Sequence, residues 1–249
     1  MLDMPTQPQI GRGPVKKKPK YFYLFFTIPA IIVVAVLIIN MLYNTPEAKA
    51  EALKETALEG EPKEALKALK TLIAKENMTA WTELVDIVNT PADQIKQNVK
   101  LVIETEKTAV APDEPVRFRL KLVNNFDRNF VFSKDSPLSI VPRINGETAN
   151  LYLGDRKLSS IFTGVYILMW PALAADAQSL HRTTIKFHLI LIPPGSSIVS
   201  HWFSVKPDAS GEATINAEQS FLVLDPNDGN EFLDPHLDLL KETVTVKIE

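Results

Sequence analysis

The chain has 249 residues, a formal net charge of −3 and 45% hydrophobic residues, which suit one or two globular domains. It contains no cysteine, so disulfides, thiolate nucleophiles and cysteine-based metal sites are excluded. The residues that follow position 43 are acidic on balance, and nucleic-acid binding depends on neutralising phosphates with basic side chains. We therefore expect no nucleic-acid partner. The known nucleophile-elbow, zinc-protease and phosphate-loop motifs are also absent from the sequence, so we expect no enzyme.

The strongest local signal is an uncharged stretch near the start of the chain. Residues 1–20 are rich in proline, glycine and lysine and are predicted to be a disordered cytoplasmic leader. Residues 21–43 contain no Asp, Glu, Lys or Arg, and as a helix they would be about 34 Å long, enough for a hydrocarbon core of about 30 Å. The apolar part of a secretion signal is shorter, although Ala48-Lys49-Ala50 is a triplet that a signal peptidase could read. The sequence therefore predicts a transmembrane helix at 21–43.

The residues around this stretch predict its orientation. The lysines that would keep the N-terminus in the cytoplasm are Lys16, Lys17, Lys18 and Lys20. The aromatic residues that would lie at the two membrane surfaces are Tyr21, Phe22 and Tyr23 at one end and Tyr43 at the other. Pro29 lies within the stretch, where a mild kink is tolerable. We predict a single-pass protein of the bacterial inner membrane with its C-terminal part in the periplasm, since an exterior part without cysteine suits a bacterial envelope.

Residues 44–98 are predicted to form a short helical stalk. Prolines that suit the first helical position occur at Pro46 and Pro62, and Thr79 and Thr90 are placed to begin two further helices. The third helix has an apolar stripe at the i, i+3, i+4, i+7 spacing, which consists of Trp81, Leu84, Val85 and Val88. We expect this stripe to pack against the second helix of the stalk.

After residue 98 the hydrophobic period changes from 3.6 to 2. Four apolar residues from Val116 to Leu122 alternate with Arg117, Arg119 and Lys121, which predicts a half-buried strand with a basic outer face. Short strand-like runs separated by turns continue to the last residue. This pattern is typical of a β-sandwich over residues 99–249.

The blocks "TAVAPDEPVRFRLKLVNN", "LILIPPGSSIVSHWFSV" and "TVTVKIE" resemble bacterial immunoglobulin-like sandwich modules. The resemblance covers residues 99–249. It implies an immunoglobulin-like sandwich that binds proteins, carbohydrates or other domains, and it supplies no catalytic residues. The predicted fold class is thus a single transmembrane helix, a short α-helical stalk and an all-β immunoglobulin-like sandwich.

Residues 193–196 are predicted to close a hairpin that would place His188 opposite His201, with Trp202 on the buried face. Two facing imidazoles could chelate zinc or copper. No third ligand is identifiable, and we favour the interpretation that the two histidines are polar residues on the solvent-facing side, so we predict neither a metal site nor a cofactor. If the loop instead crosses between sheets, the pairing disappears.

Residues 161–175, "IFTGVYILMWPALAA", form the longest apolar run after residue 43. One interpretation is a fully buried strand. The other is an exposed patch of Phe162, Tyr166 and Trp170 that contacts a partner protein or the lipid headgroups. These three aromatic residues are our candidate partner surface.

These patterns favour a non-catalytic accessory or assembly subunit of an envelope complex, held at the lipid bilayer and acting through contacts of its β-sandwich with other membrane proteins. A carbohydrate- or peptidoglycan-binding module is the alternative. A metal-handling assembly factor that uses His188 and His201 is a further hypothesis.

Overall fold

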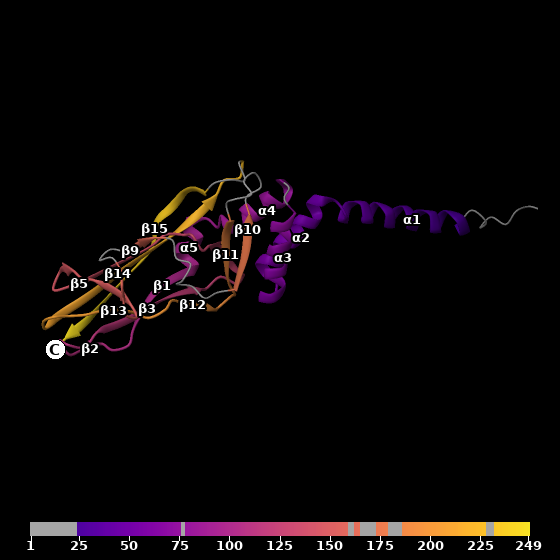
Figure 1. Ribbon diagram of the computed structural model, residues 1–249. Helices are drawn as coiled ribbons and strands as arrows, with labels where there is room; N and C mark the ends of the chain where they lie inside the picture. The colour runs from indigo at the N-terminus through magenta and orange to yellow at the C-terminus, as the bar shows by residue number, and fades with distance from the viewer. Residues whose placement is uncertain (1–23, 76–77, 159–161, 165–172, 179–185, 228–231) are drawn as a thin grey trace, which may run out of the picture. The chain divides into compact units, whose positions relative to one another are not determined.

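The computed structural model of the protein describes residues 24–75, 78–158, 162–164, 173–178, 186–227 and 232–249 (Figure 1). The chain divides into two compact units, Met1–Thr45 and Pro46–Glu249. The helices of the described residues are α1 (Leu24–Tyr43), α2 (Pro46–Glu59), α3 (Pro62–Ala74), α4 (Met78–Val88) and α5 (Ala92–Asn98).

The predicted transmembrane helix is contradicted. Among the residues that the structure describes, no helix is long and apolar enough to cross a membrane. The prediction counted uncharged residues from position 21, and the absence of charge does not by itself fix the length of a helix. Helix α1 begins at Leu24, ends at Tyr43 and contains Pro29. The prediction of a single-pass membrane protein depended on this helix and is therefore wrong as well. The predicted location of the protein remains a prediction.

In the second unit, the helices begin close to the predicted residues. Helices α2 and α3 start at Pro46 and Pro62, and α4 starts at Met78, one residue before the predicted Thr79. Proline suits the first helical turn because its missing N–H would have no partner there in any case. The side chains that α2–α4 bury are mainly alanine on α2, and Leu69, Leu72, Trp81 and Leu84 on α3 and α4. The expected pairing of α3 with α4 is therefore confirmed, and α2 joins their cluster.

The strands form a sheet A, a sheet B and a sheet C. Sheet A has the order β1 (Val99–Thr105), β3 (Val116–Asn124), β13 (Phe203–Val205), β7 (Leu151–Leu153) and β8 (Arg156–Lys157), and β12 (Ser197–Val199) also pairs with β3. Sheet B has the order β2 (Ala109–Val110), β15 (Phe232–Ile248), β14 (Gly211–Leu224), β5 (Leu138–Ile144) and β6 (Glu147–Thr148), and β9 (Phe162–Gly164) also pairs with β5. Sheet C has the order β10 (Leu173–Gln178), β11 (Lys186–Ile192) and β4 (Phe130–Ser133).

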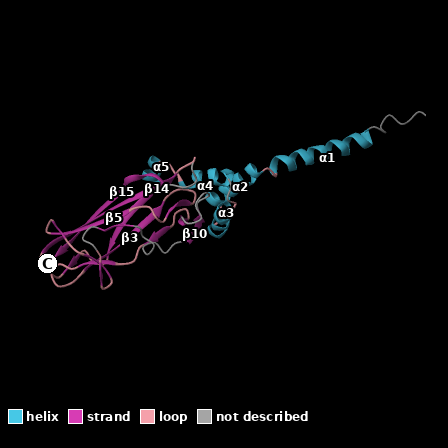
Figure 2. Cartoon of the chain, turned by 45° about the horizontal axis from the view of Figure 1, so that its top comes forward, coloured by secondary structure: helices cyan, strands magenta, loops and turns pink. Residues whose placement is uncertain are grey.

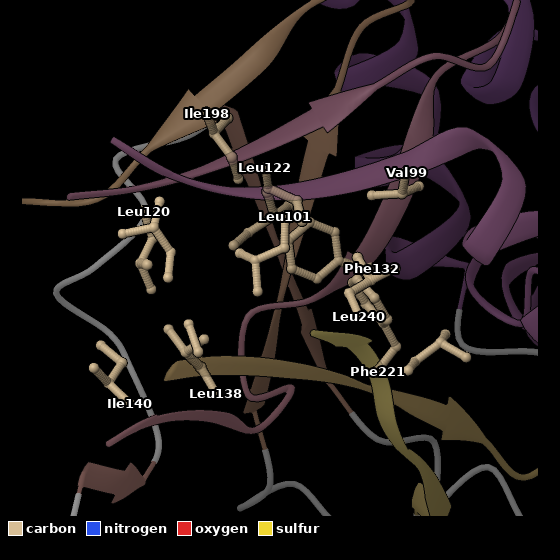
Figure 3. Close-up of a cluster of buried hydrophobic side chains, with 14 of the residues drawn as sticks. Val99, Leu101, Leu120, Leu122, Phe132, Leu138, Ile140, Ile198, Phe221 and Leu240 are labelled. Carbon is tan, nitrogen blue, oxygen red and sulfur yellow. The ribbon is translucent and has the colours of Figure 1, made fainter. Parts of the chain in front are cut away.

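The main hydrophobic core lies between sheets A and B. From Val116 to Leu122, strand β3 alternates between buried apolar and outward polar side chains, as the sequence pattern predicts. Leu120 and Leu122 of β3 lie in one cluster with Ile140 of β5 and Phe221 of β14 (Figure 3). Two sheets that share such a core form a β-sandwich, which confirms the coarser part of the predicted architecture.

Sheet C has apolar contacts on both of its faces. Phe130, Phe132 and Ile190 belong to the core between the sheets. Their neighbours Val131 and Leu189 belong to a second cluster that is built mainly from the side chains of α2–α4. Figure 2 shows these helices gathered beside the strands of the same unit. Sheet C therefore lies between the helical layer and the sandwich core.

Side-chain hydrogen bonds also fasten α4 to the end of β14. The Asn89 amide, just after α4, donates from Nδ2 to the Leu224 carbonyl at 2.8 Å and accepts from the Leu224 N–H at 2.8 Å. The Trp81 indole donates to the Asp225 carbonyl at 3.0 Å. The predicted fold class is thus wrong in its separation of helices from strands. The protein has a mixed helix and β fold, because the helices bury an apolar face that the strands of sheet C complete.

Candidate functional site

The connection at residues 193–196 does not close a hairpin. Strand β11 pairs with β10 and β4 in sheet C, whereas β12 pairs with β3 in sheet A, so the chain crosses between sheets. The fully buried Asn124 holds this crossing in place. Its Nδ2 donates to the Ile192 carbonyl at 2.8 Å and to the Arg128 carbonyl at 2.9 Å, and its backbone N–H donates to the Ser196 carbonyl at 2.9 Å.

The predicted pairing of His188 with His201 is therefore wrong. His188 lies opposite Asp176 in the ladder between β10 and β11, and the exposed His201 lies between β12 and β13. Within the described part of the chain, no group of three or more His, Asp or Glu side chains could hold a metal ion.

The crossing determines where Trp202 lies. Between β12 and β13 the Ser200 hydroxyl accepts from the Leu120 N–H at 2.9 Å and donates to the His201 carbonyl at 2.8 Å. Phe203 then faces the core, stacked on Phe118 with a centroid distance of 5.6 Å. Since successive side chains of a strand point to opposite faces, Trp202 is directed to the outer face of sheet A, where it is half-buried. The prediction of a buried Trp202 is wrong because it depended on the hairpin.

On this outer face two arginines of β3 lie over the Trp202 ring. The guanidinium carbon of Arg119 is 5.0 Å from the ring centroid, and that of Arg117 is 5.7 Å away. Each such contact stabilises by about 0.5–1 kcal/mol at an exposed site. The ring holds both guanidiniums above the sheet, where their remaining N–H groups can meet a ligand that accepts hydrogen bonds.

Acidic residues in β1 and just after it form ion pairs with these arginines. Glu104 of β1 lies opposite Arg119, accepts from Arg119 Nε at 2.8 Å, and forms an ion pair with Lys121 at 3.3 Å. The hydrogen bond from Arg119 holds the pKa of the Glu104 carboxyl below its usual value, against a smaller effect of desolvation and with help from Lys121. Arg117 pairs in the same way with Glu106 at 3.2 Å.

A second cation lies over an aromatic ring farther along sheet A. Lys206 Nζ is 4.9 Å from the ring centroid of Tyr152, and Tyr152 lies opposite Ser204 of β13. We call the outer surface of sheet A the Arg–Trp face, which we define by Arg117, Arg119, Lys121, Trp202, Tyr152 and Lys206, with Glu104 and Glu106 at its β1 side. It presents basic side chains on rigid aromatic rings in a chain that is acidic overall.

Most of the residues singled out from the sequence lie outside the described residues. Among the predicted partner surface this applies to Tyr166 and Trp170, while Phe162 lies in β9 opposite Ile140 and its side chain is not described. Among the predicted membrane and topology residues it applies to Lys16, Lys17, Lys18, Lys20, Tyr21, Phe22 and Tyr23. Pro29 is exposed in α1, and Tyr43 ends α1 with an undescribed side chain.

The sequence indicated only part of the Arg–Trp face. The alternation along β3 predicted correctly that Arg117, Arg119 and Lys121 face outward. The position of Trp202 over them depends on the pairing of β13 with β3, in which Phe203 lies opposite Phe118. Trp202 and Phe203 are adjacent in the sequence, so only one of the two rings can face the core. This adjacency was the sequence signal that could have placed Trp202 on the outer face.

Comparisons with known proteins add little to this picture. No family model matches the chain, and no curated protein does. Similar solved structures include AvmM, which catalyses macrocyclization in alchivemycin A biosynthesis, at 14% identity and a TM-score of 0.31, covering 61% of this chain and 88% of that one. They also include the CARDB domain of a Pyrococcus furiosus protein, at 11% identity and a TM-score of 0.27, covering 61% and 88%. A further one is the collagen-binding domain of a Staphylococcus aureus adhesin, at 13% identity and a TM-score of 0.25, covering 59% and 96%.

Proposed function

We propose that the chain is a non-catalytic accessory subunit of a protein complex and that it acts through protein–protein contacts of its β-sandwich. The observation that carries this proposal is the Arg–Trp face. Arginine, tryptophan and tyrosine are the residues in which the binding energy of protein interfaces is concentrated. Here they lie on a sheet whose other side is a packed core, so they are held in place before a partner arrives.

The charges of the Arg–Trp face favour a partner with acidic side chains. Arg117 and Arg119 each have an ion pair on the β1 side, but a guanidinium has five N–H donors and can serve a second acceptor. Lys206 lies over Tyr152 and is exposed. A carboxylate of the partner that approaches from solvent would meet these cations first.

A carbohydrate-binding module is less well supported by the same geometry. Sugar rings stack on an aromatic face that is open to them, whereas two guanidiniums lie over the Trp202 ring and the Lys206 ammonium lies over Tyr152. Because cations cover the Trp202 and Tyr152 rings, this face favours binding of a negatively charged partner over binding of a sugar.

Purification of the protein with its bound proteins from the cells that produce it tests this proposal. The wild-type chain should carry a partner protein in stoichiometric amount. Joint Trp202→Ala and Arg119→Ala substitutions should weaken the complex at least tenfold, about 1.4 kcal/mol, because they remove both the ring and the cation that it holds. The isolated variant should still unfold cooperatively, with a melting temperature lowered by only several degrees, since neither side chain belongs to the buried core.

Arg143→Ala is the matched control, because Arg143 is an exposed arginine of β5 on the other sheet. It should leave the complex intact. A wild-type chain that arrives alone would contradict the proposal, as would a partner that the control variant loses as readily as the double variant does.

A further inference from the structure

A row of facing side chains crosses four strands of sheet A. Ser204 of β13 lies opposite Arg117 of β3 on one side and opposite Tyr152 of β7 on the other. Lys157 of β8 lies opposite Tyr152 in the next ladder. Residues directly opposite each other in an antiparallel pair share one face of the sheet, so these four side chains form a single row. Because neighbouring strands are about 4.8 Å apart, the two ends of the row are about 14 Å apart at the backbone.

The row faces away from the core. Leu151 is fully buried, so its neighbour Tyr152 is directed outward. Lys157 is exposed, and Lys206 Nζ lies 4.9 Å from the centroid of the Tyr152 ring. The row therefore has a basic side chain at each end, Arg117 and Lys157, and a third, Lys206, over the tyrosine between them.

The cations at the two ends of the row differ in their ion pairs. The arginines of β3 are already paired with the glutamates of β1 and of the residue just after it. Among the described residues, Lys157 and Lys206 form no ion pair. The acidic residues closest to them along the chain, Asp155 and Asp208, are exposed and do not come within ion-pair distance. An unpaired cation attracts a carboxylate more strongly than a neutralised pair does, so the β8 end of the row draws an acidic ligand first.

We infer that the partner protein supplies an extended acidic segment that crosses the strands of sheet A along this row. One carboxylate of the segment binds between Lys157 and Lys206, and another binds the free N–H groups of Arg117. Five residues of extended chain span about 14 Å, and the first and fifth of them point to the same side. Two carboxylates four residues apart therefore match the two ends of the row.

This inference deepens the proposed function and rests on it, because both take the ligand to be an acidic protein. It adds the direction in which the partner segment runs. It also makes Lys157 and Lys206, at the end of the face away from Trp202, the residues that select an acidic partner.

Binding of model peptides to the full chain, followed by NMR, tests the inference. The probe is a blocked nine-residue peptide in which Glu alternates with Ser. It should shift the amides of Ser204 and Lys157 with one dissociation constant, because one chain contacts both ends of the row. A blocked Ser-Glu-Ser peptide spans only about 10 Å and cannot reach both ends, so it should bind at least tenfold more weakly. The nine-residue peptide with Lys in place of Glu should shift neither amide.

Charge reversal tests the two lysines. Lys157→Glu combined with Lys206→Glu should weaken binding of the acidic peptide at least tenfold. Lys67→Glu combined with Lys70→Glu changes the net charge by the same amount at exposed positions of α3, and it should leave binding nearly unchanged. All four lysines are exposed, so both variants should unfold as cooperatively as the wild type.

The remaining outcomes separate this inference from the proposed function. A complex that survives reversal of Lys157 and Lys206 but is lost in the joint Trp202 and Arg119 variant would overturn the crossing segment and leave the proposed function intact. Equal losses in the two reversal variants would show that net charge alone matters and would also overturn the inference. Equal binding of the lysine peptide would overturn the assignment of an acidic segment. Shifts at one end of the row only, or at neither, would overturn the inference whatever partner the chain carries.

Discussion

At the scale of single residues, the half-buried carboxylate of Asp135 lies near His188, just after β4. Burial raises the pKa of Asp135 above its ordinary value, although the nearby charges of His188 and Lys134 act in the opposite direction. A carboxyl group whose pKa is raised on folding stabilises the fold when it is protonated. That contribution is present below the unfolded-state pKa and is lost as pH rises through the folded-state pKa.

Asp135→Asn should therefore raise the urea midpoint of unfolding at pH 7, because the amide avoids the cost of a desolvated charge. The gain over wild type should shrink as pH falls below the ordinary range of aspartate, where both chains are uncharged at this position. Asp127→Asn, at an exposed position, is the matched control and should change the midpoint little. A midpoint at pH 7 that falls in the Asp135 variant would contradict this account.

Glu104 has a pH dependence of stability opposite to that of Asp135. Its pKa is lowered chiefly by the hydrogen bond from Arg119, so its contribution is present above the ordinary glutamate pKa and is lost as pH falls through the folded-state value. In Arg119→Ala we expect the pKa of Glu104, measured by NMR titration, to move up toward its ordinary value. Because both side chains are partly exposed, with relative exposures of 30% and 35%, the pair should stabilise the fold by only about 0.2–1 kcal/mol. An unchanged pKa in the variant would show that Arg119 is not its cause.

At the scale of elements, the crossing from β11 to β12 depends on one buried amide. Asn124→Ala would leave the carbonyls of Ile192 and Arg128 without the donor that they have now. We expect a loss of about 2–4 kcal/mol in the free energy of unfolding, measured by urea denaturation. Asn125→Ala, at the exposed neighbouring position, should cost less than about 0.5 kcal/mol. Equal effects of the two substitutions would mean that the crossing is held by other contacts.

The same crossing shows why the sequence predicts some elements and not others. The outward arginines of β3 and the proline starts of α2 and α3 follow from local periodicity and backbone chemistry, and the structure has them as predicted. The local pattern around residues 193–196 suits a hairpin and a crossing equally well. The crossing in the structure depends on contacts between residues far apart in the sequence, such as the hydrogen bond from Asn124 to Ile192, whose partners are 68 residues apart. The positions of His188, His201 and Trp202 depended on that choice.

At the scale of the whole molecule, the described helices α2–α4 and the strands belong to one compact unit. A chain shortened to residues 99–249 would expose Val131, Leu189 and Leu191, which the helices now cover. We expect it to lose cooperative unfolding, as measured by circular dichroism during heating. A chain shortened to residues 46–249 keeps both clusters and should unfold in a single transition. Cooperative unfolding of the 99–249 chain near the wild-type temperature would contradict a shared core.

The position of sheet C has a consequence for how the protein tolerates change. In a scan of all single substitutions, strands that have one solvent-exposed face should tolerate replacement at every second position. Strand β4 has no such side, since Phe130, Val131, Phe132 and Ser133 are all at most 2% exposed. Strand β4 should therefore appear as four consecutive positions that do not tolerate substitution. The results of such a scan would by themselves identify sheet C as the layer between the two hydrophobic clusters.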